Sequence, residues 1–204
     1  MTARASTAVR RQAILDAALH LFATRGLRGT SIEDICAASG ASNGSLYHHF
    51  GSKEGIGATL YVSAVEDYQR GALAVFRNAQ SAEAGFCGCV EHYLQWVLDH
   101  RELAVLMLAV EHTDVRELAG DEVTALNDRF RAEVAEWMSG RAVAGELPDV
   151  PGDLMMPAVL GAARRFAELW LEGKTRTPMS EAARVLPDIA WRGLAARPPA
   201  RRPT

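Results

Sequence analysis

The residues best suited to chemistry lie in the segment SNGSLYHH, which is polar and aromatic where a core helix would be aliphatic. Asn43 can exchange hydrogen bonds with the edge of a base, and the small residues beside it let a backbone approach closely. Gly44 within a helix costs about 1 kcal/mol relative to alanine, and close approach to DNA would explain its presence. Nearby hydroxyls and cations can bind phosphate. The candidate DNA-binding residues are Thr30, Ser31, Ser42, Asn43, Gly44, Ser45, Tyr47, His48 and Lys53.

Two short helices separated by a glycine turn must position these residues, as in a helix-turn-helix motif, whose second helix enters the major groove. Thr30 and Glu33 have the spacing of a capping box for the first helix. Ser42 is expected to cap the second helix, in which Leu46 and Phe50, four residues apart, face inward. The alternative is a surface helical hairpin whose polar face is accidental.

The rest of the chain has apolar residues at the helical spacing of three to four, with no convincing alternation of the kind found in strands. We therefore predict an all-α fold in which an N-terminal three-helix domain precedes a larger helical body. Gly26 suits the left-handed residue that ends the opening helix. Outside the helix-turn-helix, the predicted helices are 7–25, 53–77, 82–99, 102–110, 121–139, 153–172 and 180–196, and a proline- and arginine-rich tail follows at 197–204.

The segments LFATRG, TSIEDICAASGAS and GSLYHHFGSKEG resemble the DNA-binding domain of the TetR (tetracycline repressor) family over about residues 10–60. The resemblance implies a DNA-binding domain at 1–52 and an effector-binding and dimerisation domain at 53–196. It places Asn43, Gly44 and His48 at bases, and Thr30, Tyr47 and Lys53 at phosphates. Asn43 stands where many members have lysine, which leaves the base preference open.

The same resemblance implies a homodimer bound to a pseudo-palindromic operator of double-stranded DNA. The last two long helices would form a four-helix dimer contact, and a small apolar or amphipathic effector would release the repressor from its operator. The candidate effector-binding residues are Trp96, Met107, His112, Phe130, Trp137, Phe166 and Trp170. Each of these side chains could equally be ordinary core.

The distribution of charge agrees with a DNA-binding N-terminus. Residues 1–60 carry six Lys or Arg and four Asp or Glu, a net charge of +2. The remaining residues carry a net charge of −5, so the whole chain has a net charge of −3. The chain has no apolar run long enough for a membrane span, which needs roughly 20 residues. Three cysteines form no evident disulfide framework, which favours a reducing, cytoplasmic setting.

Three motifs resemble catalytic or metal sites, and each has the wrong context. The sequence GASNG matches a serine-hydrolase nucleophile elbow, but that motif needs a preceding strand. Residues 173–175, GKT, lack the first glycine of a phosphate-binding loop. Cys87 and Cys89, two apart on a helix, point about 200° from each other, so they do not easily share a metal ion. We therefore expect neither an enzyme nor a cofactor.

Two further interpretations remain open. The protein could be a DNA-binding activator or global regulator that has no small-molecule effector. From another class, it could be a helical enzyme or carrier whose N-terminal hairpin is incidental. Cys87 and Cys89 could also sense thiol oxidation or a metal, the alternative to simple packing of buried thiols.

Overall fold

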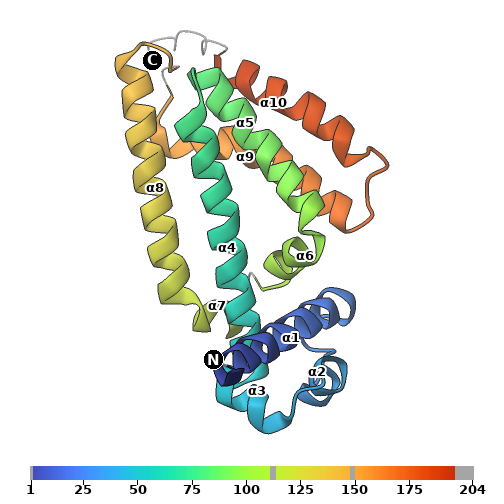
Figure 1. The fold of residues 1–204 in the computed structure, drawn as a ribbon. Helices are drawn as coiled ribbons and strands as arrows, with labels where there is room; N and C mark the ends of the chain where they lie inside the picture. Colours follow the sequence, from blue (N-terminus) through green and yellow to red (C-terminus); the bar gives the residue numbers. More distant parts are fainter. Residues whose placement is uncertain (1, 111–113, 148–149, 196–204) are drawn as a thin grey trace, which may run out of the picture. The chain divides into compact units, whose positions relative to one another are not determined.

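The computed structural model describes residues 2–110, 114–147 and 150–195, and these residues form α-helices and no strand (Figure 1). The all-α prediction is therefore confirmed. The helices are α1 (Thr2–Arg25), α2 (Ile32–Ser39), α3 (Asn43–Phe50), α4 (Lys53–Asn78), α5 (Ala82–Asp99), α6 (Arg101–Ala109), α7 (Asp114–Leu118), α8 (Gly120–Val143), α9 (Gly152–Leu171) and α10 (Met179–Ala195). The predicted tail at 197–204 lies outside the described residues.

Two local predictions are wrong. The capping box of α2 is formed by Ser31 and Asp34, one residue later than expected, because the Thr30 hydroxyl donates to the Gly26 carbonyl instead. The separate helix α7 was not predicted before α8; it is held by Val115, which is fully buried. The other helix ends fall within a few residues of their predicted positions, and Gly26 has the expected positive φ of 75°.

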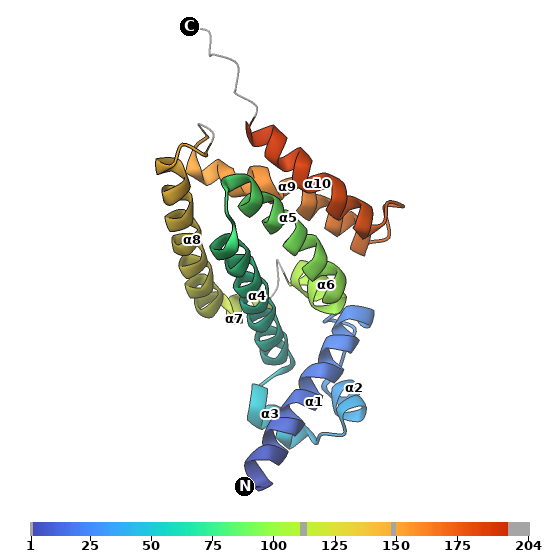
Figure 2. The same cartoon turned by 45° about the horizontal axis from the view of Figure 1, so that its top comes forward.

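The chain divides into two compact units, and α4 and α8 each contribute residues to both. Unit 1 comprises the residues up to Asp67 together with His100–Leu126. Within it, α2, α3 and α6 pack against α1, and Figures 1 and 2 show α2 and α3 beside that helix. His20 Nδ1 lies 2.8 Å from Glu102 Oε1, which ties α1 to α6. Its core is apolar and contains Ile14, Ala18, Phe22, Ile35, Leu46, Ile56, Leu106 and Val110.

Unit 2 comprises Tyr68–Asp99 and the residues from Asn127 onward. Its helices α5, α9 and α10 pack on one another. The C-terminal part of α4 lies beside α8 (Figure 2), where the Phe76 and Trp137 rings are 4.8 Å apart between centroids. Gly85 on α5 makes this packing possible, because a Cβ at that position would overlap the Trp137 ring. All four tryptophans of the chain belong to unit 2.

A search of the described helices for a membrane-spanning segment finds none of sufficient length and apolarity.

Candidate nucleic-acid interface

The turn between α2 and α3 is fixed by backbone conformation and local hydrogen bonds. Gly40 has a φ of 69°, in the left-handed region that glycine adopts without strain, and its N–H donates to the Cys36 carbonyl at 2.9 Å. Ala41 is buried. Ser42 then caps α3, because its hydroxyl accepts a hydrogen bond from the Ser45 N–H at 3.3 Å. The direction of α3 is therefore set at its first residue.

Helix α3 has one face in the core and one face in solvent. Leu46 is completely buried and Phe50 packs against the same core, as predicted. The opposite face exposes Asn43, Gly44 and His48, together with Tyr47, whose ring is 53% exposed. The residues predicted to contact bases are thus all accessible on one eight-residue helix, Asn43 and Gly44 in its first turn and His48 in its last.

Gly44 has no internal reason to be glycine. A Cβ added there would meet no atom within 4 Å, and its φ is not in the positive range. Neither packing nor backbone conformation requires glycine at this position. Close approach of DNA to this part of α3 stays a prediction.

The hydroxyls at the start of α2 are already engaged. Ser31 Oγ accepts from the Asp34 N–H at 3.1 Å and donates to Asp34 Oδ2 at 2.8 Å, and the Ser31 N–H also donates to Oδ2. These bonds from Ser31 lower the pKa of the Asp34 carboxyl, and Arg25, 3.4 Å away, acts in the same direction. Thr30 is buried, whereas Ser31 is exposed. Phosphate contact by either hydroxyl stays a prediction, and only Ser31 is accessible.

Lys53 lies at the start of α4 and is half-buried. Its ammonium donates to the Leu27 carbonyl at 2.8 Å and to the Thr30 carbonyl at 2.9 Å. The predicted phosphate ligand is therefore occupied by the loop between α1 and α2. The spacing of residues in the sequence could not reveal these bonds, because the two carbonyls are backbone atoms more than twenty residues away.

One cation that the sequence did not single out lies beside α3. The guanidinium of Arg11 on α1 stands over the Phe50 ring, 5.2 Å from its centroid. A cation–π contact of this kind orders an otherwise mobile side chain at the surface. The five arginines among the first thirty residues signalled a basic surface, but packing of α1 against α3 decides which arginine lies there.

The residues proposed for effector binding are divided between the two units. Met107 packs against the core of unit 1, whereas Trp96 and Trp137 belong to unit 2. Trp96 meets the Tyr68 ring edge-on, with centroids 5.8 Å apart. Phe130 and Trp170 are half-buried. His112 lies outside the described residues.

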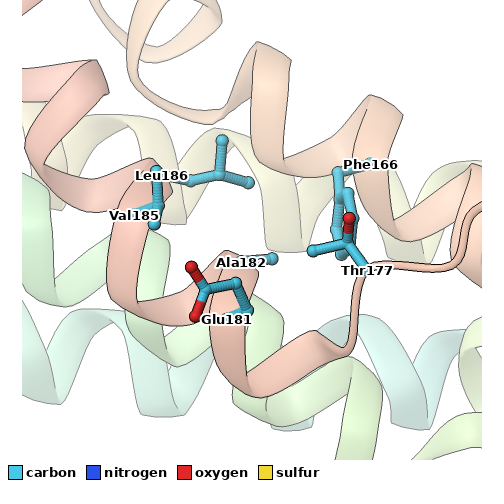
Figure 3. A pocket seen from close by; sticks show the side chains of 6 residues that line it. All are labelled: Phe166, Thr177, Glu181, Ala182, Val185 and Leu186. Atoms are coloured by element: carbon cyan, nitrogen blue, oxygen red, sulfur yellow. The ribbon is translucent and has the colours of Figure 1, made fainter.

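Phe166 lines a hollow of about 340 Å³ between α9 and α10, which is open to solvent. Figure 3 shows Phe166 and Thr177 on one side and Val185 and Leu186 on the other. Effector binding by any of these residues stays a prediction.

A polar group that sequence reasoning missed lies inside unit 2. The Tyr68 hydroxyl is buried and has no hydrogen-bond partner among the described residues, and the same is true of Trp137 Nε1. Burial raises the pKa of Tyr68, so its hydroxyl stays protonated, and the only acceptor beside it in the described residues is the weak one of the Cys89 thiol. The Cys89 thiol is its neighbour, and burial raises the pKa of that thiol to about 12. A tyrosine in a helix gives no signal in sequence that its hydroxyl will be left unpaired.

Cys87, Cys89 and His92 each contact a different group. The Cys87 thiol donates to the Pro187 carbonyl at 3.5 Å, and His92 Nε2 lies 3.1 Å from the Tyr68 carbonyl oxygen. Cys89 is buried beside the Tyr68 hydroxyl. Across the described residues no three His, Cys, Asp or Glu side chains gather as a metal site would require.

Comparison with known proteins also identifies the N-terminal helices as similar to a DNA-binding domain. The family model described as "Bacterial regulatory proteins, tetR family" matches residues 14–58. A curated relative, the HTH-type transcriptional repressor KstR2 of Rhodococcus jostii, is 50% identical over 130 residues. That match covers 60% of this chain and 60% of the length of the relative.

Solved structures extend the likeness over nearly the whole chain. A TetR-like transcriptional regulator from Rhodococcus sp. RHA1 is 26% identical with a TM-score of 0.67, and the match covers 92% of this chain and 97% of that one. Over residues 14–58 the chain is similar to the TetR family.

A third likeness, to the regulator FadR of Bacillus subtilis in complex with stearoyl-CoA, concerns the fold alone. The TM-score is 0.74 at 14% identity, over 88% of this chain and 96% of that one. The segment matched by the family model contains every candidate DNA-binding residue from Thr30 to Lys53. Arg11 and the aromatic residues of unit 2 lie outside it.

Proposed function

We propose that this protein is a sequence-specific transcriptional regulator, a homodimeric repressor that a small-molecule effector releases from a pseudo-palindromic operator. The observation that carries the proposal is the exposed face of α3. Asn43, Gly44 and His48 stand clear of the core on a helix whose position is fixed by buried Leu46. Such a helix can enter the major groove and present its N-terminal residues to base edges. The repressor name of the Rhodococcus jostii relative supports repression rather than activation.

Phosphate binding falls to accessible groups around this helix. Tyr47 is exposed at the surface of α3, Ser31 at the start of α2, and Arg11 beside Phe50. A hydroxyl or guanidinium there would fix the orientation of α3 without reading sequence. Of these groups, Arg11 supplies the charge whose neutralisation of a phosphate makes binding depend on salt.

Selection of bound sequences from random double-stranded DNA tests the proposed function. We expect an inverted repeat with half-site centres about 34 Å apart, one turn of the double helix, because two copies of α3 related by a two-fold axis must meet successive major grooves. Enrichment of a single unrepeated site would overturn the dimeric arrangement. Recovery of random sequence would overturn DNA recognition altogether and favour the helical enzyme or carrier.

The outer surface of α9 and α10 supports the proposed homodimer. Leu154 on α9 and Ile189 on α10 are 53% and 54% exposed, although both are large and apolar. After Leu154, α9 also exposes the small residues Ala158, Gly161 and Ala162 to solvent. A Cβ at Gly161 would meet nothing within 4 Å in this chain. Small and apolar residues together suit a close helix–helix contact with a second copy.

The unpaired groups inside unit 2 support an effector. A buried donor that lacks an acceptor costs free energy, and a ligand that supplies the acceptor recovers it. In the described residues Trp137 Nε1 is such a donor, and the Tyr68 hydroxyl has only the weak acceptor of the Cys89 thiol beside it. We propose an amphipathic effector that combines an apolar portion with a hydrogen-bond acceptor. The stearoyl-CoA complex of FadR, which shares the fold, supports the same class.

Tryptophan emission offers a direct screen for the effector, because all four tryptophans are in unit 2. Stearic acid and stearoyl-CoA are suitable first probes. A ligand that changes the emission should also weaken binding to the selected operator, as coupling between two sites requires. Ligands that bind and leave operator affinity unchanged would favour the regulator that has no small-molecule effector.

A bacterial protein that binds chromosomal DNA would act in the cytoplasm.

A further inference from the structure

Lys53 closes the junction of three helices in unit 1. Its Nζ lies 2.8 Å from the Leu27 carbonyl oxygen and 2.9 Å from that of Thr30, both in the loop that follows α1. The Thr30 hydroxyl donates to the Gly26 carbonyl at 2.9 Å, in the same loop. Three loop carbonyls are thus satisfied by two side chains, one of which comes from α4.

These hydrogen bonds explain why a lysine is the first residue of α4, where a positive charge is unfavourable. Lys53 is the first residue of α4, and the N-terminus of a helix carries a partial positive charge that disfavours a cation. The carbonyl groups left over after the end of α1 are partial negative charges, and the Thr30 N–H reaches the Leu27 carbonyl only at 3.5 Å. The ammonium of Lys53 fills this need, and two of its three N–H groups are used in doing so.

We infer that Lys53 is a positioning residue of the DNA-binding unit and that it does not neutralise a phosphate. It holds the loop carbonyls of Leu27 and Thr30, and Thr30 immediately precedes Ser31, the N-cap of α2. Through that loop Lys53 sets where α2 begins relative to the start of α4. Both ends of this link lie in unit 1. The inference rests on the proposed function only where DNA binding is the measurement.

Chemical labelling of the unmodified protein tests the link without DNA and without any risk to folding. The chain has one other lysine, Lys174, which is exposed and paired only with Glu172 in the described residues. Because two charge-assisted hydrogen bonds hold Lys53, an amine-acylating reagent should modify it roughly tenfold more slowly than Lys174. Equal rates in the DNA-free protein, with protection of Lys53 only after operator is added, would overturn the inference.

The salt dependence of operator binding provides the second measurement. Lys53→Met removes the charge and both hydrogen bonds, and we expect weaker operator binding with an unchanged slope of log affinity against log salt. A phosphate ligand would instead lower the slope by about 0.9. Such a fall would refute the inference whatever the labelling shows. Lys174→Met is the matched control and should alter neither quantity.

Hydrogen exchange separates failure of this inference from failure of the proposed function. Amides 26–32 should exchange faster in Lys53→Met than in the parent protein, because the loop carbonyls lose their donors. Unchanged exchange there would contradict the positioning role. Neither this measurement nor the labelling uses DNA, so both remain decisive even if no operator is found.

Discussion

Substitution of Tyr68 by phenylalanine should make the ligand-free protein more stable. The change deletes one oxygen atom whose only partner in the described residues is the Cys89 thiol, a weak acceptor, and it keeps the ring that stacks on His92, with centroids 5.5 Å apart. A buried polar group left unsatisfied costs about 1–3 kcal/mol. Loss of the weak contact with the Cys89 thiol offsets part of the gain. We therefore expect a net increase of about 1 kcal/mol in the free energy of unfolding, at the lower end of that range.

For a chain of this length, 1 kcal/mol corresponds to roughly 2–4 °C in the midpoint of thermal unfolding. Urea unfolding followed by tryptophan emission is the appropriate assay, because the emission reports on unit 2, which contains Tyr68. Tyr47→Phe is the matched control. It removes the same atom from an exposed ring in unit 1, and its effect should stay within about 0.5 kcal/mol.

A Tyr68→Phe protein that is less stable by 1 kcal/mol or so would refute the reasoning, because the hydroxyl would then have a favourable partner. An effector found by the emission screen gives a further check. If the ligand accepts a hydrogen bond from Tyr68, the variant should bind it more weakly by a factor of about ten, while the control binds it normally.

Three other predictions concern the dimer, the thiols and the response to acid. Gly161→Leu should convert the dimer to a monomer in sedimentation, because the new side chain meets nothing within its own chain and would project into the dimer contact. Gly140→Leu, equally unobstructed on α8, should stay dimeric. A Gly161→Leu protein that stays dimeric would exclude the exposed face of α9 as the dimer contact. Cys89, whose pKa burial raises to about 12, should resist alkylation at pH 8 in the folded protein and react after unfolding, and rapid alkylation in the folded state would revive the thiol sensor. The pKa of Asp34 is lowered in the folded state, so its contribution to stability is complete above the ordinary value of 3.8 and is lost as the pH falls through the lower folded value. Asp34→Asn should remove this part of the acid sensitivity, and an unchanged acid transition would contradict it.

The helix-turn-helix could be predicted from sequence because local signals define it. Gly26 and Gly40 end helices with positive φ, Ser42 caps α3, and Leu46 and Phe50 lie inward at the spacing of one helical turn. The capping box was misplaced because two adjacent residues, each able to cap, are followed by two adjacent acids. Only burial of the first hydroxyl against the loop decides between them.

What the sequence could not provide depends on contacts between distant residues. Lys53 reads as a free cation until its two carbonyl partners in the loop are known. Arg11 is one of several equivalent arginines until α1 packs against α3 and brings Phe50 beneath it. The aromatic residues of unit 2 also pack against partners that are distant in the sequence, Trp96 against Tyr68 and Trp137 against Phe76. Helical spacing predicts that a ring faces inward, but it does not predict which other rings it will meet.

The central claim is that the N-terminal residues of α3 read base sequence. Its most direct test compares Asn43→Ala, His48→Ala and Tyr47→Ala on a panel of operator variants, each altered at a single base pair. We expect the first two to relax discrimination at particular positions by about 1–3 kcal/mol, and Tyr47→Ala to weaken binding to every sequence alike. If Asn43→Ala and His48→Ala also weakened all sequences equally, α3 would not be the element that reads the operator.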